Sequence, residues 1–336
     1  MKKSKRHQAF SINLGEGAGE VKLMCSIGKC LEVFTSTGIY QVYPPESLDP
    51  AETNPDMPGL AKRVSSYGTK KRIVARVMIQ NYNLVSTHAL HKEDEKSEFA
   101  LRLHELMEAL ILCNECSEYF WKRVEEIEEK VIQEGLTPNQ NIFEDFPTTE
   151  GIEEKITTFL TKAKHSIQRV IDIFNIFHDT KISNPRIDKL IEWTEKRENI
   201  SAVTDCLKRF EPVSKQFVDL RNSQEHPSTK KRFEYTDFTI LPTNEISAPL
   251  WGINQSKSSI HKEMAFFIRE FVAFSEWLFI YLVLCEKTDN PVFGYQVIEI
   301  PNDQRDSLCP VKYSIEIRKK DEGEQGASHN ERKRSS

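Results

Sequence analysis

The chain has 336 residues, of which 38% are hydrophobic and 29% charged, and its formal net charge is -5 at pH 7. This length and composition predict a folded soluble protein of one large domain or two ordinary ones, and they exclude a largely disordered chain. An acidic chain is not drawn to nucleic acid as a whole, so any RNA-binding site must be local.

Three features of the sequence bear on the compartment. The amino terminus, 1–7, is basic, but no apolar segment or small-residue cleavage site follows it, so a secretory signal is not expected. The seven cysteines are scattered and odd in number, which favours reduced thiols. The most apolar run, 264–285, contains Arg269, Glu270 and Glu276, which predicts a buried helix and not a membrane span. We therefore expect a cytoplasmic protein without a membrane partner.

Residues 1–92 are predicted to form a β-rich region of unknown role. Short β-branched segments bounded by turn formers predict strands at 21–25, 30–34, 38–43 and 72–79. The segment 44–59 carries five prolines among polar residues, which predicts a loop.

From 93 to 146 the apolar residues recur with the helical period. One stripe runs from Phe99 to Cys113 and a second from Phe120 to Val131, ending before Gly135. This pattern predicts either a long helical hairpin or one kinked helix.

Residues 147–290 are predicted to form a helical bundle. A threonine cap before Glu150 starts a long amphipathic helix that ends near Phe177. Two or three shorter helices follow, three if the chain breaks at Pro212, then an extended stretch at 233–255 and a last helix at about 258–285.

Two short strands, 294–300 and 311–317, fall within the next segment, 291–318, and 319–336 is predicted to be a disordered tail. The predicted fold class is therefore mainly α, a helical bundle with an N-terminal β-rich region and short C-terminal strands.

One string within the bundle has a composition suited to chemistry: it runs from Arg221 through Asn222 to His226, and Pro227 follows. On an intact helix, Arg221 and His226 would lie roughly 140° apart. Pro227 disfavours helical geometry at the preceding residue, so we expect the helix to end here and the imidazole to be free to turn back. Asn222 and His226 are four positions apart and are already neighbours on a helix.

These three side chains are the set that breaks an RNA phosphodiester. His226 can take the proton from a ribose 2′-OH or give one to the leaving 5′ oxygen. Arg221 can stabilise the charge that builds on the phosphoryl oxygens, and Asn222 can orient either partner. The nucleophile belongs to the substrate, so the reaction implies no metal and no cofactor.

The Arg-Asn-x3-His string in this helical context resembles the Arg-x4-His motif of the HEPN superfamily, over roughly residues 148–288. The resemblance implies a helical bundle and a metal-independent endoribonuclease with Arg221 and His226 as its catalytic pair and Asn222 at the polar position after the arginine. It also implies a homodimer with a composite active site. Growth arrest or phage defence, with an antitoxin or regulatory protein as a further partner, would fit this family.

Local charge favours a phosphate-binding role around the motif. Between Leu207 and Arg232, seven basic side chains stand against three acidic ones. The predicted substrate-binding residues are the lysines and the arginine on either side of the motif, Lys215, Lys230, Lys231 and Arg232.

Two other interpretations stay open at this point. Arg221 could be an ion-pair partner of Asp219 or Glu225, with His226 an ordinary residue at a helix end. The chain would then be a non-catalytic helical module that binds a partner protein, or a regulatory partner of a separate enzyme. A zinc site at Cys113 and Cys116 is disfavoured, because a lone CxxC lacks a paired knuckle and both cysteines fit helical core positions.

Overall fold

The computed structural model describes residues 13–134, 146–178, 180–243, 245–286 and 293–319. About 53% of the described residues are helical, with an N-terminal sheet and short C-terminal strands, so the mainly α class is confirmed. The chain divides into two compact units. The first comprises Met1–His104, Glu198–Val203 and Ser275–Ser336, and the second Glu105–Arg197 and Thr204–Phe274. The five-segment division expected from the sequence stays a prediction.

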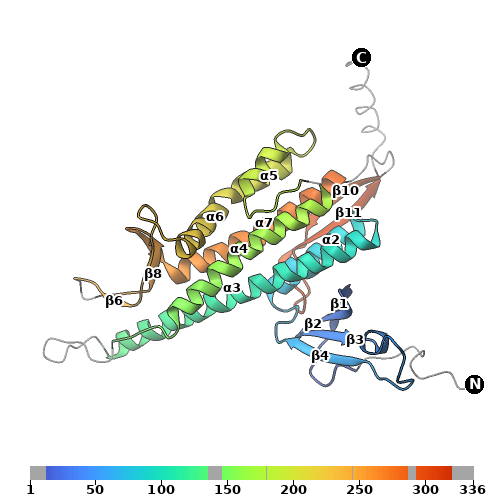
Figure 1. The fold of residues 1–336 in the computed structure, drawn as a ribbon, viewed down its shortest axis with the longest axis horizontal. Coiled ribbons are helices and arrows are strands. Elements are labelled where there is room, and N and C mark those ends of the chain that lie inside the picture. The colour runs from blue at the N-terminus through green and yellow to red at the C-terminus, as the bar shows by residue number, and fades with distance from the viewer. Residues whose placement is uncertain (1–12, 135–145, 179, 244, 287–292, 320–336) are drawn as a thin grey trace, which may run out of the picture. The chain divides into compact units, whose positions relative to one another are not determined.

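The first unit contains a four-stranded antiparallel sheet whose strands follow chain order (Figure 1). The three predicted strands before residue 44 are confirmed, and the proline-rich segment after them contains a four-residue helix, α1, Pro45–Leu48. A small core of Ala18, Val33, Tyr40 and Val42 packs on the sheet. The strands are β1 Val21–Ile27, β2 Cys30–Thr35, β3 Ile39–Tyr43 and β4 Leu60–Ser65.

The strand predicted at 72–79 is wrong. This segment forms a π-helix, η2, Val74–Gln80, which runs directly into α2, Asn81–His88. All seven residues of η2 are buried. A continuous apolar run of this length does not distinguish a buried strand from a buried helix, and here the helix is the outcome.

A buried polar network explains how η2 accommodates a charge. The guanidinium of Arg76 donates two hydrogen bonds to the carboxylate of Glu276, and both side chains are buried. Gln80 Nε2 donates to Glu276 Oε1 at 3.2 Å. The Oε1 atom of Gln80 accepts the backbone N–H groups of Lys312 and Tyr313 at 2.6 and 2.8 Å. These two hydrogen bonds fix the segment that leads into the last strand.

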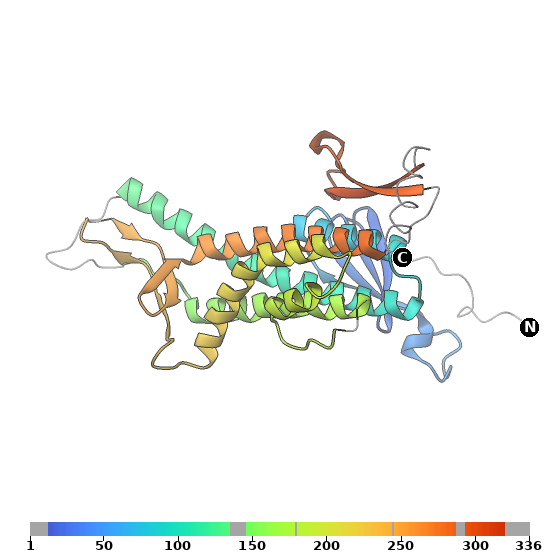
Figure 2. The ribbon, with the colours of Figure 1, turned by 90° about the horizontal axis from the view of Figure 1, so that it is seen from above.

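The C-terminal strands are confirmed as an antiparallel pair, β10 Phe293–Glu299 and β11 Tyr313–Lys319 (Figure 2). A short 3-10 helix, η3, Asn302–Gln304, lies between them. Strand β11 includes Lys319, the first residue of the tail predicted to be disordered, and the rest of that tail lies outside the described residues.

Four predictions about the helices are tested by the structure. Helix α3 is one continuous helix, Glu93–Glu134, so the hairpin alternative is wrong. Helix α4, Ile152–Phe177, begins after Gly151 at φ +64 and has no side-chain cap, so the predicted threonine cap is also wrong. Instead, Thr149 donates its hydroxyl proton to Asp237 Oδ1 at 2.7 Å. The last helix, α7, Ile260–Glu286, is confirmed.

The fourth prediction, two or three shorter helices between Pro185 and the motif, is confirmed as two helices without a break at Pro212. After α5, Ile187–Thr194, the chain forms one helix, α6, Ser201–Glu225, that contains Pro212. Phe210 and Phe217 on either side of the proline are buried. Their packing outweighs the loss of one backbone hydrogen bond, because tertiary burial supplies most helical stability in proteins.

An aromatic core holds the second unit together. Phe159 of α4 contacts Phe217 of α6, Phe267 of α7 and Trp251, with ring centroids 5.8 to 5.9 Å apart. Trp251 lies on β8 of a three-stranded antiparallel sheet, so the stretch predicted to be extended is confirmed. The strands of the second unit are β5 Phe233–Thr236, β6 Thr239–Ile240, β7 Ile246–Ser247, β8 Leu250–Ile253 and β9 Ser256–Ser259.

None of the described helices combines the length and the apolar character that crossing a membrane requires.

A substitution at Pro212 tests whether packing keeps α6 continuous at a cost in stability. Replacing the exposed Pro212 by alanine is expected to raise the free energy of unfolding by about 2 kcal/mol, because alanine restores a helical hydrogen bond and removes the ring clash. Urea denaturation followed by circular dichroism measures the change. A lower urea midpoint for Pro212→Ala would contradict the interpretation of α6 as a helix that tolerates its proline at a cost.

Candidate active site at the end of helix α6

Helix α6 ends where the sequence predicts. The last helical residue is Glu225, and the backbone N–H of His226 still donates to the carbonyl of Asn222 at 2.8 Å. Pro227 follows and has no N–H with which to continue the pattern. The His226 side chain is exposed, and its imidazole makes no hydrogen bond to any described residue.

Arg221 is held by its own helix. Its Nη1 donates to Gln224 Oε1 at 2.8 Å, and its Nη2 lies 2.9 Å from Glu225 Oε1. Only 15% of the side chain is exposed. Its Nε is buried and has no hydrogen-bond partner among the described residues. One alternative foreseen from the sequence, an ion pair between Arg221 and Glu225, is therefore present.

Lys164 of α4 reaches the same cluster. Its Nζ lies 3.1 Å from Asn222 Oδ1 and 3.0 Å from Glu225 Oε2. The hydrogen bond from Lys164 to Glu225 lowers the pKa of the Glu225 carboxyl, and the charges of Arg221 and His226 act in the same direction. The site therefore gathers two cations, one amide and one exposed imidazole around a single carboxylate.

Sequence reasoning missed Lys164, and no local signal identifies it. The lysine precedes Asn222 by 58 positions and joins the site only through the packing of α4 on α6. A second link between these helices, from Gln224 Nε2 to Thr157 Oγ1 at 2.7 Å, fixes their relative position.

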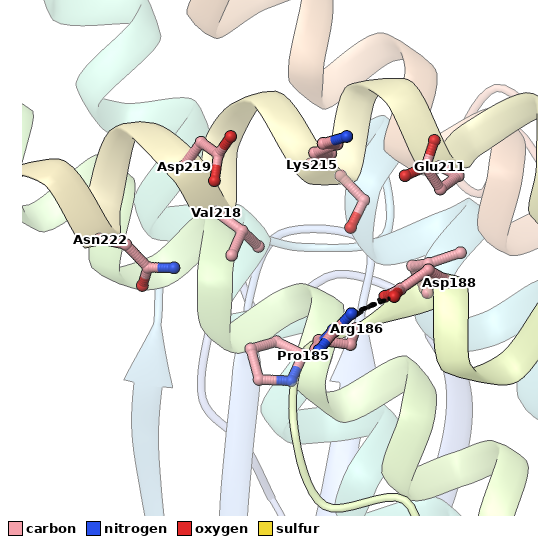
Figure 3. A pocket seen from close by; sticks show the side chains of 10 residues that line it. Pro185, Arg186, Asp188, Glu211, Lys215, Val218, Asp219 and Asn222 are labelled. Carbon is pink, nitrogen blue, oxygen red and sulfur yellow. Dashed lines mark hydrogen bonds and ion pairs between the residues drawn. The ribbon is translucent and has the colours of Figure 1, made fainter. Parts of the chain in front are cut away.

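A hollow of about 460 Å³ lies beside Asn222, between α6 and the chain that enters α5 (Figure 3). Lys215, a predicted substrate-binding residue, lines it together with Asn222, whereas Arg221 and His226 do not. Two cationic and three carboxylate side chains line the hollow. The guanidinium of Arg186 donates a hydrogen bond to the carboxylate of Asp188. This hollow does not favour a polyanion by charge. Its charged residues are Arg186, Lys215, Asp188, Glu211 and Asp219.

The other predicted substrate-binding residues lie beyond the helix end. Lys230, Lys231 and Arg232 are all exposed on the segment between His226 and β5. Asn254 braces this segment: its side chain donates to the Lys230 carbonyl at 2.9 Å and accepts the Arg232 N–H at 3.0 Å. The ammonium of Lys231 also lies 3.2 Å from a carboxylate oxygen of Asp219 on α6.

The two cysteines of the CxxC string are buried on α3. Burial raises the pKa of Cys116 to about 11 and that of Cys113 well above its ordinary value, so both stay thiols at neutral pH. Among the described residues, no group of three or more histidine, cysteine or acidic side chains is placed to hold a metal ion.

Comparison with protein-family models, with curated proteins and with solved structures gave no match for this chain. The resemblance to the HEPN superfamily therefore rests on the motif and on its helical setting alone.

Proposed function

We propose that this protein is a metal-independent endoribonuclease that cuts RNA by attack of a ribose 2′-OH on the adjacent phosphorus. The observation that carries the proposal is the exposed imidazole of His226 at the end of α6, beside the cluster of Arg221, Asn222 and Lys164. An exposed imidazole at a helix end can accept a proton from a bound substrate, as histidine does in general base catalysis.

In the proposed reaction, His226 accepts the 2′-OH proton while the 2′ oxygen forms a bond to phosphorus. The bond from phosphorus to the 5′ oxygen breaks, and the leaving oxygen takes a proton from the imidazolium of the second subunit. The products are a 2′,3′-cyclic phosphate and a 5′-hydroxyl. Arg221 and Lys164 stabilise the charge on the phosphoryl oxygens, and Asn222 orients the ribose.

The composite site requires a homodimer, as the family resemblance implies, with Arg221 and His226 supplied by both copies. By the same resemblance, the protein would act in the cytoplasm as a toxin or phage-defence effector, under the control of an antitoxin or regulatory protein.

A product analysis tests the chemistry. Single-stranded RNA incubated with the protein in EDTA is expected to give fragments that end in 2′,3′-cyclic phosphates and begin with 5′-hydroxyls, identified by mass spectrometry. Cleavage that stops in EDTA, or fragments with 5′-phosphates, would contradict the mechanism.

The Glu225 carboxylate pairs with Lys164 and Arg221, so these ion pairs must break before a phosphate can bind the two cations. Replacing Glu225 by glutamine frees the charges of Lys164 and Arg221 and is expected to tighten RNA binding about fivefold, the equivalent of about 1 kcal/mol. Fluorescence anisotropy with a labelled RNA measures the change. Glu98→Gln is the matched control, because it removes an exposed carboxylate that pairs with Arg102 in the first unit. Equal affinities of the two variants would show that Glu225 does not compete with phosphate.

The ion pair of Arg221 favours a second candidate, a non-catalytic helical module that binds a partner protein. In that case Arg221 only braces α6 through Gln224 and Glu225. The two candidates differ in one measurement: under the second, the purified wild type shows no cleavage of RNA.

A further inference from the structure

A second hollow, of about 390 Å³, lies between the loop at 181–186 and helix α5. Four of its side chains are cationic and one is a carboxylate, within a chain whose net charge is -5. The charged residues are Lys181, Arg186, Lys189 and Lys196 with Glu192, and Trp193 forms an aromatic wall.

The charge of this hollow is the reverse of that beside Asn222, where carboxylates outnumber cations. Glu192 accepts hydrogen bonds from Lys189 at 2.7 Å and neutralises it in part. Lys196 makes no ion pair with a described carboxylate. Arg186 is paired in the same way with Asp188 outside the hollow. Cations still outnumber carboxylates in the lining, and an excess of one charge on a concave surface attracts ions of the opposite sign.

The loop that borders the hollow is fixed by its own hydrogen bonds. Asn175 at the end of α4 donates to the carbonyl of Ile182 at 3.0 Å and accepts the hydroxyl proton of Thr180. Lys181 has a left-handed backbone with φ +57, which is unusual for a lysine. A strained residue held in place by its neighbours is typical of a binding loop.

Trp193 adds a rigid apolar surface. Its ring makes an edge contact with Phe174 at 5.7 Å, and the guanidinium carbon of Arg197 lies 3.2 Å from its ring centroid. Arg197 and the His178 ring, whose centroid is 5.1 Å away, already pack on Trp193, so the contact with nucleic acid falls to the cationic side chains.

We propose that this hollow binds backbone phosphates of single-stranded RNA, as a second contact of the substrate whose cleavage is proposed above, so this inference rests on the proposed function. Arg186 lines both hollows, so the two lie next to each other on the same face of α5 and its entry. The RNA backbone would then be held at α5 by charge, while its scissile group lies at the end of α6.

The test measures RNA binding separately from cleavage. All proteins carry His226→Ala, and a fluorescein-labelled single-stranded 12-mer is titrated in EDTA. The double variant Lys189→Glu with Lys196→Glu is expected to bind at least about tenfold more weakly than its parent. Its plot of log K against log salt should be shallower by at least about one unit, because two phosphate contacts are lost.

A matched control makes the same change of charge elsewhere. Lys29→Glu with Lys70→Glu alters two exposed lysines of the first unit and is expected to bind RNA nearly as the parent does. The neutral pair Lys189→Gln with Lys196→Gln should give an intermediate loss, and circular dichroism checks the fold of each variant.

The outcomes are distinguishable from those of the proposed function. Weaker binding by the α5 variant than by the control supports the hollow as an RNA site, even if wild-type protein cuts no RNA. Equal binding by the two variants overturns the inference, even if cleavage by the wild type is confirmed. Tighter binding of a short inorganic polyphosphate than of the RNA at the same phosphate concentration, with the same loss in the α5 variant, would show a site for free phosphates and would also overturn it.

Discussion

Replacing His226 by alanine is expected to lower the rate of RNA cleavage by about 10²- to 10⁴-fold, the usual contribution of a positioned general acid or base. The variant should fold normally. The His226 side chain is exposed and its one hydrogen bond within the described chain is made by the backbone N–H, which alanine keeps. Cleavage of a labelled RNA under single-turnover conditions measures the rate, and the urea midpoint checks the fold.

The matched control is His91→Ala, which removes an exposed histidine of the first unit and should leave the rate unchanged. Arg221→Lys extends the test, because lysine keeps the charge but not the planar fork that binds two phosphate oxygens. We expect its rate to fall between those of the wild type and His226→Ala. Full activity of both His226→Ala and Arg221→Lys would remove the site from the proposed mechanism.

The site shows where sequence reasoning succeeds and where it stops. Pro227 has a local steric effect, so the end of α6 at Glu225 was predictable from the neighbouring residues alone. The contact between Lys164 and Asn222 depends on how two helices pack, and no sequence spacing encodes it. Because Glu225 lies four positions after Arg221 on one helix, the Arg221 ion pair was foreseeable as an alternative.

The fold follows the same division. The apolar stripe of α4 has the helical period over its whole length, and its helix was predicted. The β-branched residues of Val74–Gln80 and the proline at position 212 disfavour a helix locally. Both segments are helical nevertheless, because burial of the surrounding side chains outweighs these local preferences. In η2, the buried Arg76 pairs with Glu276, which lies 200 positions later in the chain.

That partner, Glu276, carries the largest expected effect on stability. Replacing Glu276 by alanine leaves the guanidinium of Arg76 buried without its counter-charge and is expected to lower the free energy of unfolding by about 3–5 kcal/mol. Gln80 also loses the carboxylate to which its side-chain N–H group donates. Urea denaturation measures the loss. Glu270→Ala is the matched control on α7, because Glu270 is partly exposed and should contribute less than about 1 kcal/mol.

A paired substitution separates the charge from the packing. Arg76→Met combined with Glu276→Leu removes both charges and keeps most of the buried volume, so its stability should lie much closer to the wild type than that of Glu276→Ala. A double variant as unstable as Glu276→Ala would mean that the hydrogen bonds around Gln80 hold η2, and not the balance of charge. A stable Glu276→Ala variant would mean that water reaches Arg76, against its 6% exposure. The π-helix would then owe its form to apolar packing alone.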